Sequence, residues 1–515
     1  MTHFEPRISD NPVLFVCCVP TSYKLCLPFV GSKVHPSAPF GTRDGSHHEQ
    51  MIRSYGMLKP MFESMEREMF RLGREEILEG KADSIRRAIE HAILEERLKP
   101  GDTLPTVRSL AEELGINKNT VAVAYRQLQQ SGLVTADGRR GSVVSSLASH
   151  RQNRGATMGG GKTMSVRDGN PDIDLLPSET EIRDALARMS VEHRLYGEQR
   201  NYAPFVEWAE QCFGADNIEV PRGVFVSAGA LDLVERALNA AGLTPGDKVA
   251  VEDPGYMSQH ALVRSMGFKL LPLQLDQNGV VPASLRSALK GGAKAVITSS
   301  RAQNPTGVTT SKSRATELKS IVNGARDVLY IDDDHSNILN LSPYNPWHMG
   351  ARRWVTVRSL SKSLGPDYRV AISTGDSDTI ERLENRQSVG MGWVSTFLQR
   401  MALELLTSAS VQKKVAAAGV AYRERYELLH SALRKKGFNV IGSAGLNLWV
   451  PIPNDREVAE SLFDGGWLVR PGRDFCVTEQ SGIRVTSSRL TSQQTVAFVD
   501  ALVAVRNATA TTLVA

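Results

Sequence analysis

The segment SLSKSLGPDYR, residues 359–369, decides which fold and chemistry this chain can have. It follows the apolar run Trp354–Val357 and places Lys362 between the hydroxyl of Ser359 and the guanidinium of Arg369. A lysine amine can form a Schiff base with an aldehyde, while hydroxyl and guanidinium groups can bind a phosphate on the same small molecule. The segment therefore predicts a site for a phosphorylated aldehyde.

Three consecutive carboxylates follow another apolar run, Val328–Ile331. Ionised Asp332, Asp333 and Asp334 would repel each other strongly unless a cation or a function holds them together. A protonated pyridine nitrogen would satisfy one of them, whereas Mg²⁺ is the competing interpretation because Asp-rich strand ends bind it. No GxxxxGK[ST] phosphate loop accompanies the aspartates, so we predict an organic cofactor and no metal.

Two turns supply the other groups that a flat ring would need. The turn 252–256 ends in Tyr256, whose side chain can stack on a ring, and the turn 304–307 begins with Asn304, whose amide can donate to a ring hydroxyl. Apolar runs alternate with helical stretches, which predicts a mostly parallel sheet covered by helices. These runs are Gly223–Val226, Lys248–Val251, Ala293–Thr298, Val328–Ile331 and Trp354–Val357. Ligands of such folds gather at the carboxyl ends of the strands.

Residues 104–134 (LPTVRSLAEELGINKNTVAVAYRQLQQSGLV) and 138–144 (GRRGSVV) indicate a helix-turn-helix followed by a β-hairpin. Asp83 or Ser84 is expected to cap the start of an earlier helix. The last helix of the unit presents a polar, cationic edge that fits a DNA major groove, and the hairpin would be a wing tipped with two arginines. This geometry alone leaves a protein-interaction module open.

Both parts of the chain resemble known families. The segments 104–134 and 138–144, within a unit that spans about 83–145, resemble the GntR type of winged helix-turn-helix, and the later motifs together resemble fold-type I aminotransferases, which bind pyridoxal 5′-phosphate. The whole chain resembles the MocR group of transcription regulators, nearest to its PtsJ-like branch, which is linked with vitamin B6 control. The resemblance implies an α/β fold with a mostly parallel large domain and a smaller C-terminal α+β domain, preceded by the winged helix. The expected parts are a disordered extension (1–75), a DNA-binding domain (76–145), a linker (146–166) and a cofactor-binding domain (167–505).

The resemblance also assigns roles to individual residues. Lys362 would be the catalytic Schiff-base lysine, Asp333 would pair with the pyridine nitrogen, and Arg484 would bind the carboxylate of an amino-acid effector. The other expected cofactor contacts are Tyr256, Asn304, His335, Ser359, Arg369, the backbone of Gly229, Ala230 and Leu231, and Tyr196 from the partner subunit of a homodimer. The residues expected to contact double-stranded DNA are Thr106, Arg108, Lys118, Asn119, Thr120, Arg139, Arg140 and Gly141.

Two positions depart from the family's pattern. His335 stands where the family usually has tyrosine, which alters control of the ring hydroxyl and of the Schiff-base pKa. Leu231 stands where the family commonly has glutamine, so side-chain help in holding the phosphate is missing. We therefore do not expect fast transamination, and we expect weaker cofactor binding that responds to concentration.

The sequence thus predicts a regulator, and not an enzyme, whose operator affinity responds to pyridoxal phosphate or to an amine that reacts with it. By analogy, its target would be a vitamin B6 salvage gene such as that of a pyridoxal kinase. Two alternatives stay open. One is an active aminotransferase with an accessory winged helix, and the other is a regulator whose large domain only dimerises around a vestigial cofactor site.

Composition sets few further limits. The 515 residues are 41% hydrophobic and 23% charged, and a net charge of +5 is too small to imply nucleic-acid binding by itself. The five cysteines lack disulfide or zinc-ligand spacing, which predicts a reducing, cytoplasmic location. The apolar stretch Val13–Val30 contains Pro20, Lys24 and Pro28, so we expect no membrane span.

Overall fold

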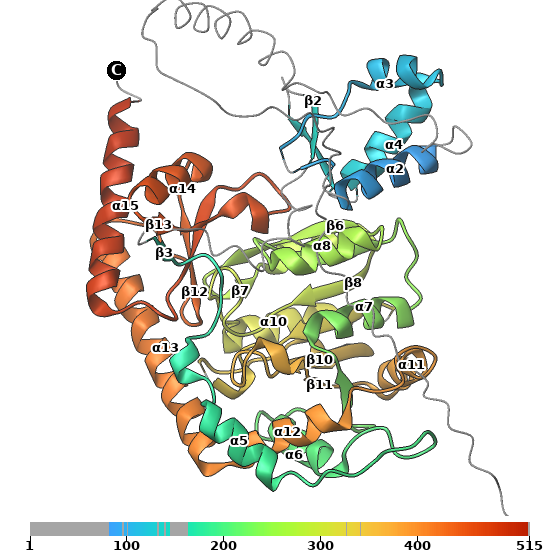
Figure 1. Cartoon of the computed structure of the whole chain (residues 1–515), viewed down its shortest axis with the longest axis vertical. Helices are drawn as coiled ribbons and strands as arrows, with labels where there is room; N and C mark the ends of the chain where they lie inside the picture. The colour runs from blue at the N-terminus through green and yellow to red at the C-terminus, as the bar shows by residue number, and fades with distance from the viewer. Residues whose placement is uncertain are drawn as a thin grey trace, which may run out of the picture. The chain divides into compact units, whose positions relative to one another are not determined.

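The computed structural model describes residues 82–94, 97–99, 101–130, 133–137, 141–144, 163–325, 327–339 and 341–512. The expected disordered extension, most of the expected linker, and the two wing arginines Arg139 and Arg140 lie outside the described residues. The described part comprises a winged-helix unit before residue 145 and a larger α/β unit after residue 162 (Figure 1). No helix in this described part combines the length and apolar character needed to cross a lipid bilayer.

The described residues of the winged-helix unit form three helices and one hairpin. The elements are α2 (Ala82–Leu94), α3 (Val107–Leu114), α4 (Lys118–Gln130), β1 (Val134–Asp137) and β2 (Gly141–Val144). The two strands pair in antiparallel register, with Asp137 opposite Gly141. Because α2 begins at Ala82, Asp83 and Ser84 lie inside the helix and not at its start, where the sequence placed them.

A tight turn sets the angle between α3 and α4. Thr106 caps α3 by accepting a hydrogen bond from the Ser109 amide at 3.1 Å. Gly115 ends α3 with a φ of 68°, in the left-handed region that glycine adopts without strain. The Asn117 side chain then accepts from the Asn119 amide at 2.8 Å as α4 begins. One apolar core joins the helices and strands, and it includes Ile85, Ile89, Leu110, Val121, Ala124, Leu128, Val134 and Val144.

An eight-stranded sheet forms the centre of the larger unit (Figure 1). Its strands are β4 (Phe225–Ser227), β5 (Lys248–Asp253), β6 (Lys269–Asp276), β7 (Gly279–Val280), β8 (Ala293–Thr298), β9 (Leu329–Asp333), β10 (Arg353–Ser359) and β11 (Ala371–Gly375). The order is β4-β11-β10-β9-β8-β5-β6-β7, in which the neighbours from β10 to β6 are parallel and the other pairs are antiparallel. The mostly parallel sheet is confirmed, and each of the five apolar runs overlaps one of its strands.

Helices cover both faces of this sheet, so its central strands are buried on both sides. Along β9, Leu329 and Ile331 face one apolar core and Tyr330 faces the other. One face packs on α7 (Ala230–Ala240), α8 (Met257–Ser265) and α11 (Ser377–Ser388). The other face packs on α5 (Glu179–Arg188), α6 (Ala203–Gly214), α9 (Pro282–Lys290), α10 (Lys312–Val322), α12 (Thr396–Thr407) and the first half of α13 (Ala409–Lys435). Short 3₁₀ helices are η3 (Ile173–Leu175), η4 (Asn337–Leu339), η5 (His348–Gly350), η6 (Pro366–Tyr368) and η7 (Gly472–Phe475).

The C-terminal part forms the smaller α+β layer that was predicted. Its elements are β12 (Asn447–Pro451), β14 (Arg470–Pro471), β15 (Gly482–Thr486), α14 (Asp455–Asp464) and α15 (Ser492–Thr512), packed with the second half of α13. A further pair, β3 (Met164–Ser165) with β13 (Trp467–Leu468), lies partly in the stretch expected to be linker. Val166 is buried in the same core, so the ordered unit begins before residue 167, and α15 continues past residue 505.

Candidate cofactor and effector site

The carboxyl ends of neighbouring strands bring the predicted cofactor residues together. Asp333 is the last residue of β9 and lies opposite Val357 of β10, and Ser359 is the last residue of β10. Lys362 follows in the turn after β10, and Asn304 follows β8 on the other side of β9. Parallel strands end at the same edge of a sheet, so residues that are far apart in sequence share one site.

Asp333 is the incompletely paired member of the three consecutive aspartates. Its side chain is buried, and its Oδ1 has no hydrogen-bond partner among the described residues. Asp332 accepts hydrogen bonds from the Ser300 amide and hydroxyl, both at 2.9 Å, and from the Tyr344 hydroxyl at 2.6 Å. The protein itself therefore satisfies Asp332 and leaves an oxygen of Asp333 for an outside partner.

Asp334 is held by two buried arginines. Arg301 donates to its two oxygens at 2.6 and 2.7 Å, and Arg358 donates to one of them at 2.9 Å. Both outer carboxylates are thus used inside the protein, and Asp333 is the one left to meet a cation. This arrangement fits a pyridinium nitrogen, which needs one carboxylate, better than Mg²⁺, which takes several oxygen ligands.

The electrostatics of Asp333 favour the same partner. Burial, and then the charges of Asp332 and Asp334, raise the pKa of Asp333 from its ordinary value of 3.8 to about 7. A cation beside the carboxylate would lower this pKa again and stabilise the ionised form. A protonated ring nitrogen would therefore stabilise the ionised carboxylate of Asp333.

Lys362 has the properties of a lysine that reacts with aldehydes. Its Nζ donates to the carbonyl oxygen of Gly169 at 2.7 Å. Burial, and then the charge of Arg484, lower the pKa of Lys362 from 10.5 to about 8. The lowered pKa increases the fraction of neutral amine near pH 7, and the neutral amine is the form that attacks an aldehyde.

The N-terminus of α7 forms the predicted phosphate-binding end. Gly229 has a φ of 108°, and a Cβ there would lie 2.6 Å from Nη2 of Arg369, which donates to the Ala228 carbonyl at 2.9 Å. The first N–H groups of a helix have no intrahelical partner, so those of Ala230 and Leu231 can bind an anion. Because only glycine lets Arg369 approach this helix end, the arrangement fits a phosphate dianion.

Three other predicted residues have different surroundings. Ser359 is buried and donates to the Ser361 hydroxyl at 3.0 Å, and Tyr256 is half-buried beside an apolar cluster at the start of α8. His335 is half-buried, and burial followed by the charge of Lys362 lowers its pKa to about 4. The imidazole is therefore neutral at physiological pH, where it can exchange hydrogen bonds but adds no charge beside Lys362.

Arg484 lies at the small-domain end of the site. Its Nη1 donates to Oδ1 of Asn304 at 3.1 Å, its Nη2 donates to the carbonyl of Arg167, and its guanidinium lies 4.8 Å from the ring centre of Phe475. These partners are uncharged, and its Nε is buried without a partner among the described residues. Burial, and then repulsion from Arg470, lower the pKa of Arg484 to about 9. A buried guanidinium in these surroundings can bind an anion.

Sequence reasoning missed two parts of the site. The segment Arg167–Gly169 supplies the carbonyl oxygens that accept hydrogen bonds from Arg484 and Lys362, and a Cβ on Gly169 would lie 3.3 Å from the Arg484 guanidinium. The only sequence signal of this segment was a glycine three residues after the expected linker, at position 169. Arg470 was also missed, because its place opposite Arg484 depends on the register of β14 with β15.

The expected partner-subunit contact does not lie in the site of its own chain. Tyr196 is 92% exposed and contacts Trp393 edge to face, with ring centres 5.7 Å apart. It therefore sits on the surface of this chain, and its role toward a second copy stays a prediction.

The predicted DNA-contacting residues that the structure describes are accessible. Thr106, Arg108, Lys118, Asn119 and Gly141 are exposed, and Thr120 is half-buried. Arg108 is paired with Glu112 at 3.1 Å, but both side chains are largely exposed, so this ion pair contributes little to stability and does not prevent a phosphate contact. Lys118 and Asn119 lie in the first turn of α4, where the recognition helix was expected to meet DNA.

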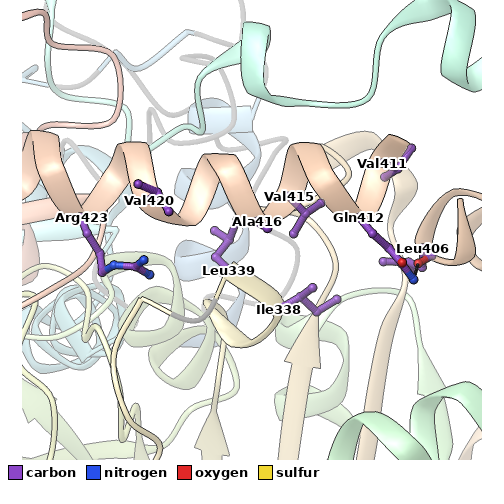
Figure 2. A pocket seen from close by; sticks show the side chains of 9 residues that line it. All are labelled: Ile338, Leu339, Leu406, Val411, Gln412, Val415, Ala416, Val420 and Arg423. Carbon is purple, nitrogen blue, oxygen red and sulfur yellow. Dashed lines mark hydrogen bonds between the residues drawn. The ribbon is translucent and has the colours of Figure 1, made fainter. Parts of the chain in front are cut away.

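A hollow of about 410 Å³ lies against one side of α13 (Figure 2). Figure 2 shows side chains of α13 facing others from η4 and from the end of α12. Its lining residues are Ile338, Leu339, Leu406, Val411, Gln412, Val415, Ala416, Val420 and Arg423. None of the residues predicted to contact cofactor, effector or DNA belongs to this lining, so we assign the chemistry to the strand ends.

Comparison with known proteins decides the family. Residues 81–144 match the family described as bacterial regulatory proteins, gntR family, and residues 169–502 match aminotransferase class I and II. The vitamin B6 salvage pathway transcriptional repressor PtsJ of Salmonella typhimurium is 36% identical over 425 residues, which are 81% of this chain and 97% of that protein. This chain belongs to the MocR-type regulators. The HTH-type transcriptional regulator TauR of Rhodobacter capsulatus is 27% identical to this MocR-type regulator over 434 residues, which are 76% and 88% of the two chains.

Solved structures agree on the fold of the larger unit. Kynurenine aminotransferase of Pyrococcus horikoshii matches with a TM-score of 0.61 at 20% identity, covering 68% of the MocR-type regulator and 91% of that chain. An archaeal alanine:glyoxylate aminotransferase matches with a TM-score of 0.61 at 21% identity, covering 68% and 92%. The predicted transferase fold is confirmed. Pyridoxal 5′-phosphate is the cofactor of this domain, and the settings of Asp333, Lys362 and Gly229 fit it.

Proposed function

We propose that this MocR-type regulator binds its operator with an affinity that changes when pyridoxal phosphate, or an amine that reacts with it, occupies the site around Lys362. The family supports a DNA-binding role in the cytoplasm, and the named function of PtsJ supports a link to vitamin B6 salvage. By the same analogy, the controlled gene is one of vitamin B6 salvage, such as that of a pyridoxal kinase.

The observation that carries this proposal is the set of contacts made by the segment Arg167–Gly169. Its two carbonyl oxygens accept hydrogen bonds from Lys362 and Arg484, which are the side chains expected to bind the cofactor and the effector. A ligand on either side chain competes for the same donor groups. Ligand binding is thereby coupled to the backbone of Arg167–Gly169, which follows in sequence the connection to the winged helix. An allosteric response requires contacts of this kind, which differ between the ligand-free and ligand-bound states.

A second copy of this chain is part of the proposal. The loops joined by the contact of Tyr196 with Trp393 expose large apolar side chains, among them Val191 at 76%, Leu195 at 70% and Val389 at 77%. Exposed apolar groups gathered in one place indicate a protein contact. A homodimer would cover them, bring Tyr196 to the partner's cofactor phosphate, and favour an operator with two half-sites.

The test is a titration of the full-length protein with fluorescent promoter DNA, with and without pyridoxal phosphate, while the visible absorbance of bound cofactor is recorded. We expect cofactor absorbance and a shift in DNA affinity to develop together in the wild type. The matched control Lys312→Ala, at an exposed lysine of α10, should behave in the same way. Lys362→Ala should still bind DNA but lose both the absorbance and the shift. Unchanged DNA affinity at full cofactor loading would contradict the proposal.

A second candidate function is an active aminotransferase, which the presence of Lys362, Asp333 and Arg484 in one site favours. The two functions differ in turnover. A regulator releases at most about one keto acid per cofactor site, whereas an aminotransferase given an amino donor and 2-oxoglutarate releases many. Sustained production of keto acid from several donors would favour the enzyme.

A further inference from the structure

Two arginines face each other across the small-domain sheet at the effector end of the site. Arg470 of β14 lies directly opposite Arg484 of β15 in antiparallel register. Opposite residues of an antiparallel pair point to the same face of the sheet, with Cβ atoms about 5 Å apart. Because Arg484 reaches Asn304 from that face, the side chain of Arg470 begins on the side of the sheet that faces the cofactor site.

The positive charge of this pair is poorly compensated within the protein. Nε of Arg470 and Nε of Arg484 are both buried without a partner in the part of the chain that the structure describes. Nη1 of Arg470 donates a long hydrogen bond of 3.4 Å to Asp474, which offsets one positive charge of the two. Like charges directly opposite each other destabilise a sheet, so the pairing needs a reason other than folding.

A third arginine adds to the excess charge. Burial, and then repulsion from Arg470, lower the pKa of the Arg167 guanidinium, as they do for Arg484. Asp168 is also close, but it already forms an ion pair with Arg489 at 2.5 Å. The effector end thus holds more positive charge than a single carboxylate would neutralise.

We propose that Arg470 and Arg484 form a paired anion site that selects an amine with two carboxylates, an acidic amino acid, as the effector. The inference rests on the proposed function, in which an amine reacts at the Lys362 site. One carboxylate occupies Arg484, and the second occupies Arg470. A neutral side chain would leave the buried Nε of Arg470 without an acceptor among the described residues, and sites built around a buried polar group discriminate strongly against ligands that cannot pair with it.

The first measurement is calorimetric binding to the full-length, cofactor-loaded protein, using L-aspartate against L-asparagine and L-glutamate against L-glutamine. Each acid differs from its amide in charge and hardly in size. We expect at least one acid to bind about tenfold or more tightly than its amide, because a hydrogen bond to a buried charged group has that effect on affinity. Equal affinities within both pairs would overturn the inference without any variant.

The second measurement assigns the preference to one residue. Arg470→Gln should reduce the ratio of acid to amide affinity to within about threefold by weakening the acid alone, and Arg470→Lys should restore part of the ratio. The matched control Arg473→Gln, at an exposed arginine paired with Asp455, should keep the wild-type ratio. Weakening of acid and amide alike in Arg470→Gln would overturn the assignment. An acid preference with DNA affinity unchanged both by cofactor loading and by the acid would contradict the proposed function and leave this inference standing.

Discussion

The two ends of the candidate site are incomplete in opposite ways. At the ends of β9 and β10, one oxygen of the buried Asp333 carboxylate has no partner in the described part of the chain, while its neighbours Asp332 and Asp334 are paired within the protein. At the small-domain end, Arg470 and Arg484 have buried Nε groups without partners among the described residues. One end lacks positive charge, and the other lacks negative charge.

This difference identifies a pair of ligands better than either end does by itself. Buried polar groups are rarely left unpaired in native proteins, so orphaned groups of opposite sign indicate ligands of opposite sign. A pyridinium ring completes Asp333, and carboxylates complete the arginines. The pKa of Lys362 responds to the charges of both Asp333 and Arg484, so the reactive amine senses both ends.

The largest expected effect is a loss of cofactor affinity when the negative charge of Asp333 is removed. Asp333→Asn should weaken pyridoxal phosphate binding by about a hundredfold or more, since breaking a buried charge pair costs roughly 3–5 kcal/mol. Equilibrium titration of cofactor absorbance measures the change. The matched control Asp332→Asn replaces a neighbouring carboxylate that is already satisfied by Ser300 and Tyr344, and it should retain cofactor affinity within about tenfold. Equal losses in the two variants would mean that Asp333 has no special part in cofactor binding.

The next largest expected effect is a loss of amino-acid affinity when the positive charge of Arg484 is removed. Arg484→Gln should weaken binding of L-glutamate and L-aspartate by about 10- to 100-fold, because it removes a buried, charged hydrogen-bond donor. Affinity for pyridoxal phosphate should fall by less than affinity for the amino acids, because Arg484 touches the cofactor end only through Asn304 and through its charge near Lys362. Arg456→Gln is the control, since that exposed arginine forms a surface ion pair with Glu460. If Arg484→Gln weakened cofactor binding as much as amino-acid binding, the two ends of the site would not bind their ligands independently.

The cofactor end was predictable from sequence because its chemistry lies at strand ends. Apolar runs fix the strands, parallel strands end at one edge, and so Asp333, Lys362 and Asn304 were expected to meet. Arg369 was predicted from its place close to Lys362 in the sequence and Gly229 from the family resemblance, and the structure adds the close approach that requires glycine there.

The effector end was only half predictable, for a physical reason. Arg484 has a recognisable motif, but the position of Arg470 follows from strand register, which a two-residue strand such as β14 does not reveal in its sequence. The contacts of Arg167–Gly169 are made through backbone carbonyl oxygens, which every residue has and no pattern marks. The β3 pairing was missed for the same reason, since two residues show no periodicity.

A smaller effect should appear in the cofactor-free protein. The pKa of Asp333 is raised in the folded state to about 7, so the folded protein keeps a proton that the unfolded chain releases above its ordinary value of 3.8. Stability therefore falls as pH rises from about 4 to 7, and the full penalty is present above pH 7. Asp333→Asn should remove it and stabilise the cofactor-free protein by about 1–3 kcal/mol at pH 8, and by less at pH 5. Denaturant unfolding at the two pH values measures this, and a larger gain at pH 5 would contradict the assigned cause.

The smallest expected effect comes from a substitution in the winged-helix unit. It tests whether cofactor affinity depends on the larger unit alone. Thr106 was expected to contact DNA, and the structure shows that its hydroxyl already caps α3 through the Ser109 amide. Thr106→Ala should therefore lower the local stability of α3 by about 1 kcal/mol, seen as roughly fivefold faster amide hydrogen exchange in that helix. Thr106→Ser keeps a capping hydroxyl and should exchange nearly as slowly as the wild type. Cofactor affinity should be the same in all three proteins, because Asp333 and Lys362 take their charge environment from residues of the larger unit.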